Sequence, residues 1–174
     1  MTIEFGTATA IDAQTFGQPG QRTFRLRIIG STRRLAHLWV EKQHLQALDL
    51  ALMQALAQLN YHDEPQEPPA DFPDQAAHEF RVGRMAIGLD QSDGTVLLHA
   101  FQLGDEEEAE PTLQVRLRPN QCAALDLRLK EIIAAGRPIC RLCGASIDPT
   151  GHACVRANGH SRQPIPEEGN EEQT

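Results

Sequence analysis

The chain has 174 residues, 40% of them hydrophobic and 23% charged, with a formal net charge of −8. These proportions are typical of a globular domain, and a chain of this length can bury a sizeable core. No apolar run reaches the roughly 18 residues that a membrane-spanning helix needs, and the first residues show no signal-peptide pattern. The composition therefore argues against a membrane protein and predicts a cytoplasmic one.

The acidic residues are concentrated in three segments. Residues 63–74 and 105–110 hold five acids each, and residues 161–174 hold four acids against one arginine. Together these segments carry a net charge of −13, so the rest of the chain carries +5. We interpret the segments as solvated loops and a tail, which means that the acidic pI of about 5.3 does not by itself exclude nucleic acid as a partner.

Residues 1–62 predict three strands and a helix. Apolar side chains at Phe24, Leu26 and Ile28 alternate with polar ones, the pattern of a half-buried strand. Apolar side chains between Leu45 and Leu59 recur at helical spacing. The expected strands span 5–11, 23–29 and 35–40, and the expected helix spans 43–59.

The same pattern returns in residues 78–136, after a proline-rich acidic linker at 63–77 that has little to pack. Gly83 fits a bulge within the first of these strands, and Gly94 fits a hairpin turn. The second helix should begin at Pro119 and end before Gly136. The expected strands span 80–89, 95–103 and 113–118.

Sequence identity between the two helices supports an internal duplication. Ala47-Leu48-Asp49-Leu50 recurs 77 residues later as Ala124-Leu125-Asp126-Leu127. We call two residues equivalent when they are separated by these 77 positions. Because the element order also matches, we predict an α+β fold built from two β-β-β-α units, with the helices covering an antiparallel sheet.

A cluster of metal-binding residue types lies after the second helix, in residues 137–160. Cys140 and Cys143 are separated by two residues and followed by Gly144, the pattern of a zinc knuckle. His152 and Cys154 are two residues apart and would point to one face of an extended segment. These four residues predict a Zn²⁺ site that is structural, because protein ligands fill all four positions. The tail at 161–174 is expected to be disordered.

Other interpretations of this cluster stay open. His160 could replace His152 as the fourth ligand, and the cysteines could instead form a reduced or redox-active pair. The fourth cysteine, Cys122, falls on the apolar face of the second predicted helix and is expected in the core.

A second candidate site is basic. The loop with Gln18 and Gly20, together with Arg22, could hold an anion, although its Pro-Gly pair also fits a rigid type II turn. Arg25 and Arg27 share one face of their strand and could bind a phosphorylated ligand or single-stranded nucleic acid near an aromatic side chain. A solvated sheet face is the simpler alternative.

The sequence contains no recognised catalytic motif. His99 with Asp90, and His78 with Glu79, are conceivable acid–base pairs, but none stands in the sequence context of a known nucleophile, metalloprotease or nucleotide-binding loop. The sequence therefore favours a protein without enzymatic activity.

Three stretches resemble a known family. They are residues 17–24, reading Gly-Gln-Pro-Gly-Gln-Arg-Thr-Phe, residues 79–88, reading Glu-Phe-Arg-Val-Gly-Arg-Met-Ala-Ile-Gly, and the cysteine-containing stretch from Gly136 to Gly159. Together they resemble a bacterial family, domain of unknown function family 3090, over about residues 5–160. Val155 and His160 depart from the family pattern, where proline and tyrosine are expected. The resemblance implies a pathway shared with a kinase-like and a phosphatase-like protein.

The sequence thus favours a zinc-containing binding or adaptor protein with a protein partner. The alternative is an enzyme, or an accessory subunit of one, that acts on a phosphorylated small molecule through the region of Arg22, Arg25 and Arg27. Nucleic-acid binding is the third hypothesis.

Overall fold

The structure is a computed structural model that describes residues 1–69, 71–136, 140–145, 147 and 151–158. The chain divides into two compact units, residues 1–136 and residues 137–174. The first unit contains all the strands and both long helices of the described residues, and the second contains one short helix, α3 (Val155–Asn158).

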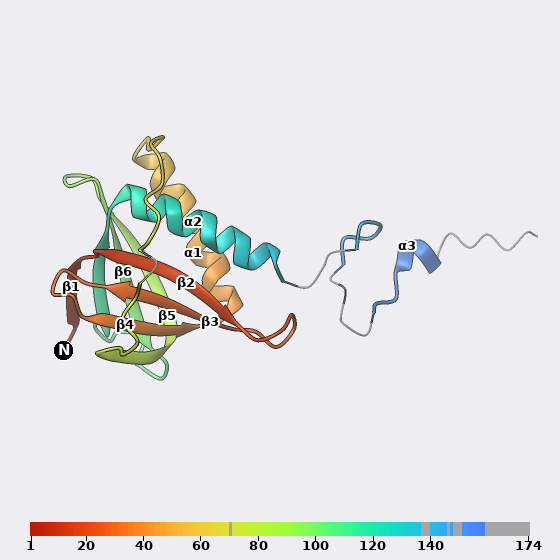
Figure 1. Cartoon of the computed structure of the whole chain (residues 1–174), viewed down its shortest axis with the longest axis horizontal. Coiled ribbons are helices and arrows are strands. Elements are labelled where there is room, and N and C mark those ends of the chain that lie inside the picture. Colours follow the sequence, from red (N-terminus) through yellow and green to blue (C-terminus); the bar gives the residue numbers. More distant parts are fainter. Residues whose placement is uncertain (70, 137–139, 146, 148–150, 159–174) are drawn as a thin grey trace, which may run out of the picture. The chain divides into compact units, whose positions relative to one another are not determined.

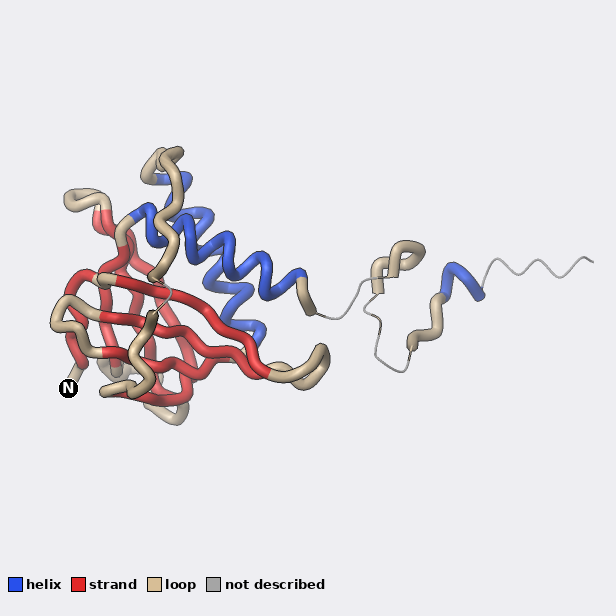
Figure 2. The backbone as a smooth tube through the Cα atoms, in the orientation of Figure 1, coloured by secondary structure: helices blue, strands red, loops and turns tan. Residues whose placement is uncertain are grey.

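In the first unit, two strand-rich halves each end in a helix (Figures 1 and 2). The elements of the first half are β1 (Ile3–Thr7), β2 (Ala10–Phe16), β3 (Thr23–Ile29), β4 (Leu35–Val40) and α1 (Lys42–Gln58). The elements of the second half are β5 (His78–Asp90), β6 (Thr95–Gln102), β7 (Leu113–Leu117) and α2 (Pro119–Ala134).

The seven strands form one mixed sheet in the order β1-β7-β6-β5-β4-β3-β2. Its two end strands, β1 and β2, are consecutive in the chain. The N–H of Ala8 donates to the carbonyl oxygen of Arg116 on β7, the strand that pairs with β1. The N–H of the next residue, Thr9, donates to the carbonyl oxygen of Ile29 on β3, and both distances are 2.8 Å. The chain therefore passes from one end of the strand order directly to the other, which makes the sheet barrel-like and joins its edges.

Two predictions from the sequence are wrong in detail. The strand expected at 5–11 is two strands, because the chain changes its partner at Ala8 and Thr9. The sheet is not purely antiparallel, because β4 pairs with β5 and β1 with β7 in parallel, whereas the other four pairings are antiparallel. Helix α1 carries the chain from the end of β4 to the start of β5, and such a crossover produces a parallel pair.

The parallel pairings occupy matching places in the two halves. Ala36 of β4 is opposite His78 of β5, and its equivalent in the second half, Leu113 of β7, is opposite Ile3 of β1. Long strand β5 also changes its register between Val82 and Arg84, at the bulge expected from Gly83. This recurrence agrees with the internal duplication, which stays a prediction about the origin of the chain.

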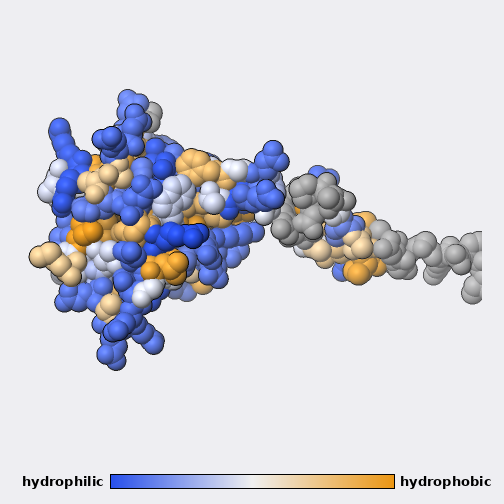
Figure 3. Space-filling view, turned by 90° about the horizontal axis from the view of Figure 1, so that it is seen from below, coloured by the Kyte–Doolittle hydropathy of each residue, from blue (hydrophilic) through white to orange (hydrophobic). Residues whose placement is uncertain are grey.

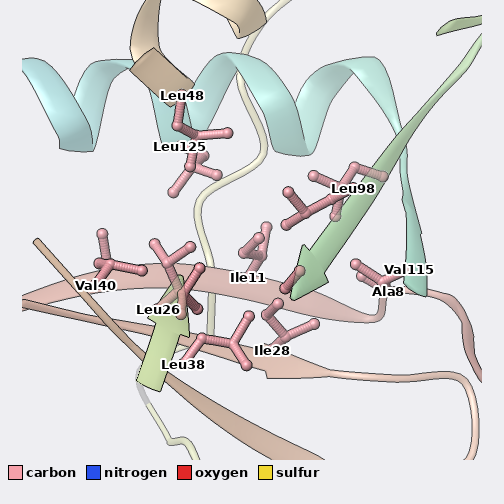
Figure 4. Packing of buried hydrophobic residues seen from close by; sticks show 14 of the residues in the cluster. Ala8, Ile11, Leu26, Ile28, Leu38, Val40, Leu48, Leu98, Val115 and Leu125 are labelled. Atoms are coloured by element: carbon pink, nitrogen blue, oxygen red, sulfur yellow. The ribbon is translucent and has the colours of Figure 1, made fainter. Parts of the chain in front are cut away.

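The core lies between the inner side of the curved sheet and the two helices. Alternate residues of the strands are buried, among them Leu26, Leu38 and Leu98, each 0% exposed. Leu48 from α1 and Leu125 from α2 point toward the strand residues in Figure 4. Since side chains from both halves belong to one cluster, neither half has a separate core.

Both helices are attached to the opposite half by the same contact. The backbone N–H of Glu41 donates to Nδ1 of His44, so the ring carries its proton on Nε2, which lies 3.2 Å from the Gly83 carbonyl oxygen. Gln121, the equivalent of His44, repeats this geometry: Oε1 accepts the Arg118 N–H, and Nε2 donates to the Ala8 carbonyl oxygen at 2.9 Å. Each side chain thus joins the start of its helix to a bend in the other half, which is at Gly83 within β5 for His44 and at Ala8 between β1 and β2 for Gln121.

The acidic linker makes more contacts than its composition suggests. Gln66 forms backbone and side-chain hydrogen bonds with Asn120, each at 3.0 Å, and the N–H of Ala77 donates to Leu35 O. The guanidinium of Arg27 lies 4.0 Å from the ring centroid of Phe72. These contacts tie the linker to both α2 and the outer side of the sheet.

We expect Gln121→Ala to lower the free energy of unfolding by about 1–3 kcal/mol, because it leaves the Ala8 carbonyl without its buried donor. The matched variant His44→Gln should cost less than about 1 kcal/mol, because glutamine can make both contacts of the partly exposed His44 ring. Chemical denaturation measures both changes. Equal losses in the two variants would contradict the role assigned to these contacts.

Candidate functional site

The metal-ligand residues lie in the second unit on a short folded turn. The N–H of Gly144 donates to Cys140 O at 2.9 Å, and the N–H of Cys140 donates to Ala145 O at 2.8 Å. Gly144 has φ 72°, a left-handed conformation that glycine adopts without steric cost. This turn brings Cys140 and Cys143 to the same side, as the knuckle pattern predicts.

The four residues expected as ligands come together. One ligand atom from each of Cys140, Cys143, His152 and Cys154 lies within 4.8 Å of all the others. The sulfurs of Cys140 and Cys154 are 3.7 Å apart, and Cys143 Sγ is 3.2 Å from His152 Nε2. The three sulfurs and one imidazole nitrogen could therefore hold one metal ion.

The separations suit a small tetrahedral ion. Bonds of roughly 2.3 Å to sulfur place the sulfurs of a tetrahedral site roughly 3.8 Å apart, close to the 3.7 Å between Cys140 and Cys154. Both of these cysteines are buried, each 8% exposed, whereas Cys143 and His152 are partly exposed. A set of thiolates and imidazole is typical of zinc and other borderline-soft metals.

The local backbone already favours a thiolate at one ligand. Backbone N–H groups of Cys143 and Leu142 donate to the Cys140 sulfur and lower its pKa to about 7. At Cys143 the Ala145 N–H also lowers the pKa, but burial and the neighbouring thiols outweigh it, so the pKa is raised overall. The thiolate is the form that binds metal, so the turn prepares one ligand before an ion arrives.

The remaining cysteine and histidine candidates are elsewhere. Cys122 is 0% exposed on α2, and burial raises its pKa to about 12, which confirms it as a core residue. His160, the alternative ligand, lies outside the described residues. The histidine of the described cluster is His152.

The arginines of the basic candidate site have partners within the protein. Arg25 donates to Gln14 Oε1 from Nε at 3.1 Å and from Nη2 at 2.6 Å. Its guanidinium also contacts the rings of Phe16 and Trp39, at 4.9 and 5.2 Å from their centroids. Its Nη1 is 3.4 Å from His37 Nδ1. Arg25 is therefore held by polar and aromatic contacts on the outer side of the sheet.

Arg27 and Arg22 are held in different places. Arg27 forms an ion pair with Asp12 at 2.7 Å beside Phe72. Arg22 donates to the Ile132 carbonyl at 2.9 Å near the end of α2 and stacks on the ring of the buried Phe24. Since the strand alternates faces, the structure separates Arg22 from the side chains of Arg25 and Arg27.

The loop before β3 is a tight turn. Gln21 N–H donates to Gln18 O at 2.9 Å, and Gly20 has φ 93°, as required at the third position of a type II turn. The loop side chains Gln18 and Gln21 are exposed. Its geometry is explained by turn formation alone.

The acid–base pairs considered from the sequence do not form. Asp90 accepts hydrogen bonds from Ser92 and Arg116. Both bonds lower the pKa of Asp90, the one from Ser92 more, and bring it to about 2. Glu79 accepts the Trp39 indole N–H at 2.6 Å, whereas His78 accepts from Arg34 at 3.3 Å. Asp90 and Glu79 therefore act as fixed ion-pair or hydrogen-bond acceptors.

A carboxylate pair that the sequence reasoning did not single out lies between the helices. Asp49 of α1 and Asp126 of α2 are the aspartates of the repeated Ala-Leu-Asp-Leu sequence, and Lys130 forms ion pairs with both. Burial, followed by a hydrogen bond with Asp126, raises the pKa of Asp49. The repeated sequence was the available signal, since the two aspartates occupy equivalent positions in it and both pair with Lys130.

Together, the fold and the cluster define a mixed α+β protein with a group of three cysteines and one histidine that could hold a metal ion. The chain belongs to the family described as protein of unknown function (DUF3090), whose model matches residues 3–154 and includes all four ligand residues. Comparison with curated proteins and with solved structures found no match.

Among the helices of the described residues, none is both long and apolar enough to cross a membrane. The cytoplasmic location expected from the sequence stays a prediction.

We expect Asp49→Asn to stabilise the protein near neutral pH. The folded state raises the pKa of Asp49, so folding favours the protonated carboxyl group. The stability that this group contributes is fully present below the unfolded pKa of about 3.9 and is lost as the pH rises through the folded pKa. Asparagine resembles the protonated acid and avoids this loss. Unfolding free energies of the two proteins should therefore diverge as the pH increases from 4 to 7.

The exposed linker residue Asp74 provides the control, since Asp74→Asn should change stability by less than about 0.5 kcal/mol at every pH. A loss of stability in Asp49→Asn at pH 7 would instead mean that the ion pair with Lys130 outweighs burial.

Proposed function

We propose that this protein is a zinc-containing binding or adaptor protein whose metal site is structural. The observation that carries the proposal is the convergence of four ligand atoms, from Cys140, Cys143, His152 and Cys154, within 4.8 Å of one another. Four protein ligands complete the coordination of Zn²⁺, whereas catalysis requires an open position.

Bound zinc would supply a cross-link between the Cys140–Cys143 turn and the segment with His152 and Cys154. Such a link contributes folding free energy, which small zinc units need because their own apolar core is insufficient. Three thiolates and a neutral imidazole would leave the complex with a charge of about −1. The exposed side chains of Arg141 and Arg156 are close in sequence to offset that charge.

Two apolar side chains beside the ligands support a binding role. Leu142 lies between the first two cysteines and is 55% exposed, and Val155 follows the last cysteine and is 77% exposed. A single exposed leucine is common on protein surfaces, but here two of the residues next to the proposed metal ligands are large, apolar and exposed. A zinc-stabilised turn would present them to a partner in a fixed geometry.

The kinase-like and phosphatase-like proteins implied by the family resemblance are the first candidates for that partner. The alternative, an enzyme or accessory subunit acting on a phosphorylated molecule, relies on Arg22, Arg25 and Arg27. Their internal contacts would have to be exchanged for the ligand, which makes this alternative less favourable. The same cost applies to nucleic-acid binding.

Elemental analysis should find about one zinc ion per chain of purified protein. Cys140→Ser and His152→Ala should each lose the ion, and chelator should make residues 140–158 sensitive to protease while the 1–136 unit keeps its melting temperature. Cys122→Ala and His160→Ala are the matched controls and should retain zinc. Zinc retained in His152→Ala but lost in His160→Ala would reassign the ligand and reopen a catalytic role.

Binding to the candidate partners should weaken by about tenfold or more in Leu142→Asp, since burying a charge in an apolar contact is costly. The matched control is Leu50→Asp on α1, because Leu50 is also 55% exposed. Co-purification and calorimetry measure binding, and elemental analysis verifies that zinc remains. Equal effects of the two substitutions would rule out a partner surface at the zinc turn.

A further inference from the structure

A crevice in the first unit lies where the parallel strands β4 and β5 separate. The two strands are paired up to Trp39 and Arg81. Beyond this pair, β4 ends and the chain enters α1, whereas β5 bends at the Gly83 bulge to pair with β6. Strands that diverge at their carboxyl ends leave a space between them, and ligands commonly bind at such places in sheets with parallel strands.

The space has a volume of about 420 Å³, which is sufficient for a small organic molecule. Its inner wall consists of the core side chains Phe24, Val40 and Val82, exposed by only 5%, 6% and 4%. Its outer walls combine apolar, aromatic and charged side chains, namely Thr23, Trp39, Glu41, Arg81 and Leu103. The face of the unit in Figure 3 likewise shows apolar side chains exposed among hydrophilic ones.

Arg81 carries the only positive charge among the wall residues. Among the described residues its guanidinium has no hydrogen-bond or ion-pair partner, although its backbone carbonyl accepts the Leu103 N–H. The carboxylate of Glu41 accepts from Gln43 and lies at the start of the 17-residue helix α1, where the helix dipole offsets negative charge. An anion in the pocket would therefore meet an unpaired guanidinium, while the helix dipole weakens its repulsion by Glu41.

The corresponding place in the second half is already filled by internal contacts. Arg116, the equivalent of Trp39, forms ion pairs with Asp90 at 3.0 Å and with Asp93 at 3.5 Å. Arg118, the equivalent of Glu41, lies 3.5 Å from Ala8 O. Because the parallel pairings β4–β5 and β1–β7 are equivalent, the unpaired Arg81 of β5 beside an open space is specific to the β4–β5 pairing and not a consequence of the fold.

We propose that this crevice binds a small organic anion with a planar apolar part. The guanidinium of Arg81 would bind a carboxylate, sulfonate or phosphate, while the apolar part lies between Trp39, Leu103 and the core side chains of the inner wall. The site shares no residue with the metal cluster, because every wall residue belongs to the 1–136 unit.

Trp39 permits a direct test, because it is the only tryptophan in the chain. The probe is 1-anilinonaphthalene-8-sulfonate, compared with N-phenyl-1-naphthylamine, which has the same rings without the sulfonate. On the full-length protein, the sulfonate should quench Trp39 emission saturably by energy transfer. Arg81→Gln should weaken sulfonate binding about tenfold and change binding of the uncharged probe by less than about twofold.

The matched control is Arg33→Gln, which removes the same charge from an exposed arginine in the β3–β4 loop. It should leave both affinities within about twofold, and circular dichroism should show that both variants remain folded. The proposal is overturned if Trp39 emission does not respond to the sulfonate, or if Arg81→Gln weakens sulfonate binding no more than Arg33→Gln. It is also overturned if Arg81→Gln weakens both probes equally, since that indicates a loss of packing.

Discussion

The transfer of the chain from β7 to β3 at Ala8 and Thr9 is the constraint on which the rest of the first unit depends. Two consecutive backbone N–H groups donate to β7 and to β3, the neighbours of the two end strands, so one short bend links both ends of the strand order. Open sheet edges expose unpaired backbone groups to other chains, and closure removes them. The curvature that closure requires also forms the concave inner side on which the single core is built.

The helices stabilise this closure at its two bends. Gln121 saturates the Ala8 carbonyl, and His44 contacts the carbonyl of Gly83 in the corresponding strand. A bend exposes backbone groups that a regular ladder would pair, so a side-chain donor at each bend removes the cost of leaving them unpaired. The two parallel pairings differ, since Arg116 of β7 forms ion pairs, whereas the β4–β5 pairing opens into the crevice beside the unpaired Arg81.

Local patterns explain which features the sequence could predict. The helices, the Gly83 bulge and the convergence of Cys140, Cys143, His152 and Cys154 depend on residues close together in the chain, and the structure agrees. The parallel pairing of β1 with β7 joins the first and last strands of the unit, where no local period carries information. The same limit applies to Arg25 and Arg27: a pattern can place them on one face, but their partners come from other strands and the linker.

The two candidate sites therefore depend on different physics. The metal cluster consists of four residues close together in the chain, two of them on one short turn. The crevice exists because β5 leaves β4 at Gly83, where an added Cβ would lie 3.1 Å from the Leu103 backbone. A side chain there must displace the loop that carries one wall of the crevice, without touching any metal ligand. Substitution of Gly83 should thus separate the two sites within one chain, which makes their roles independently measurable.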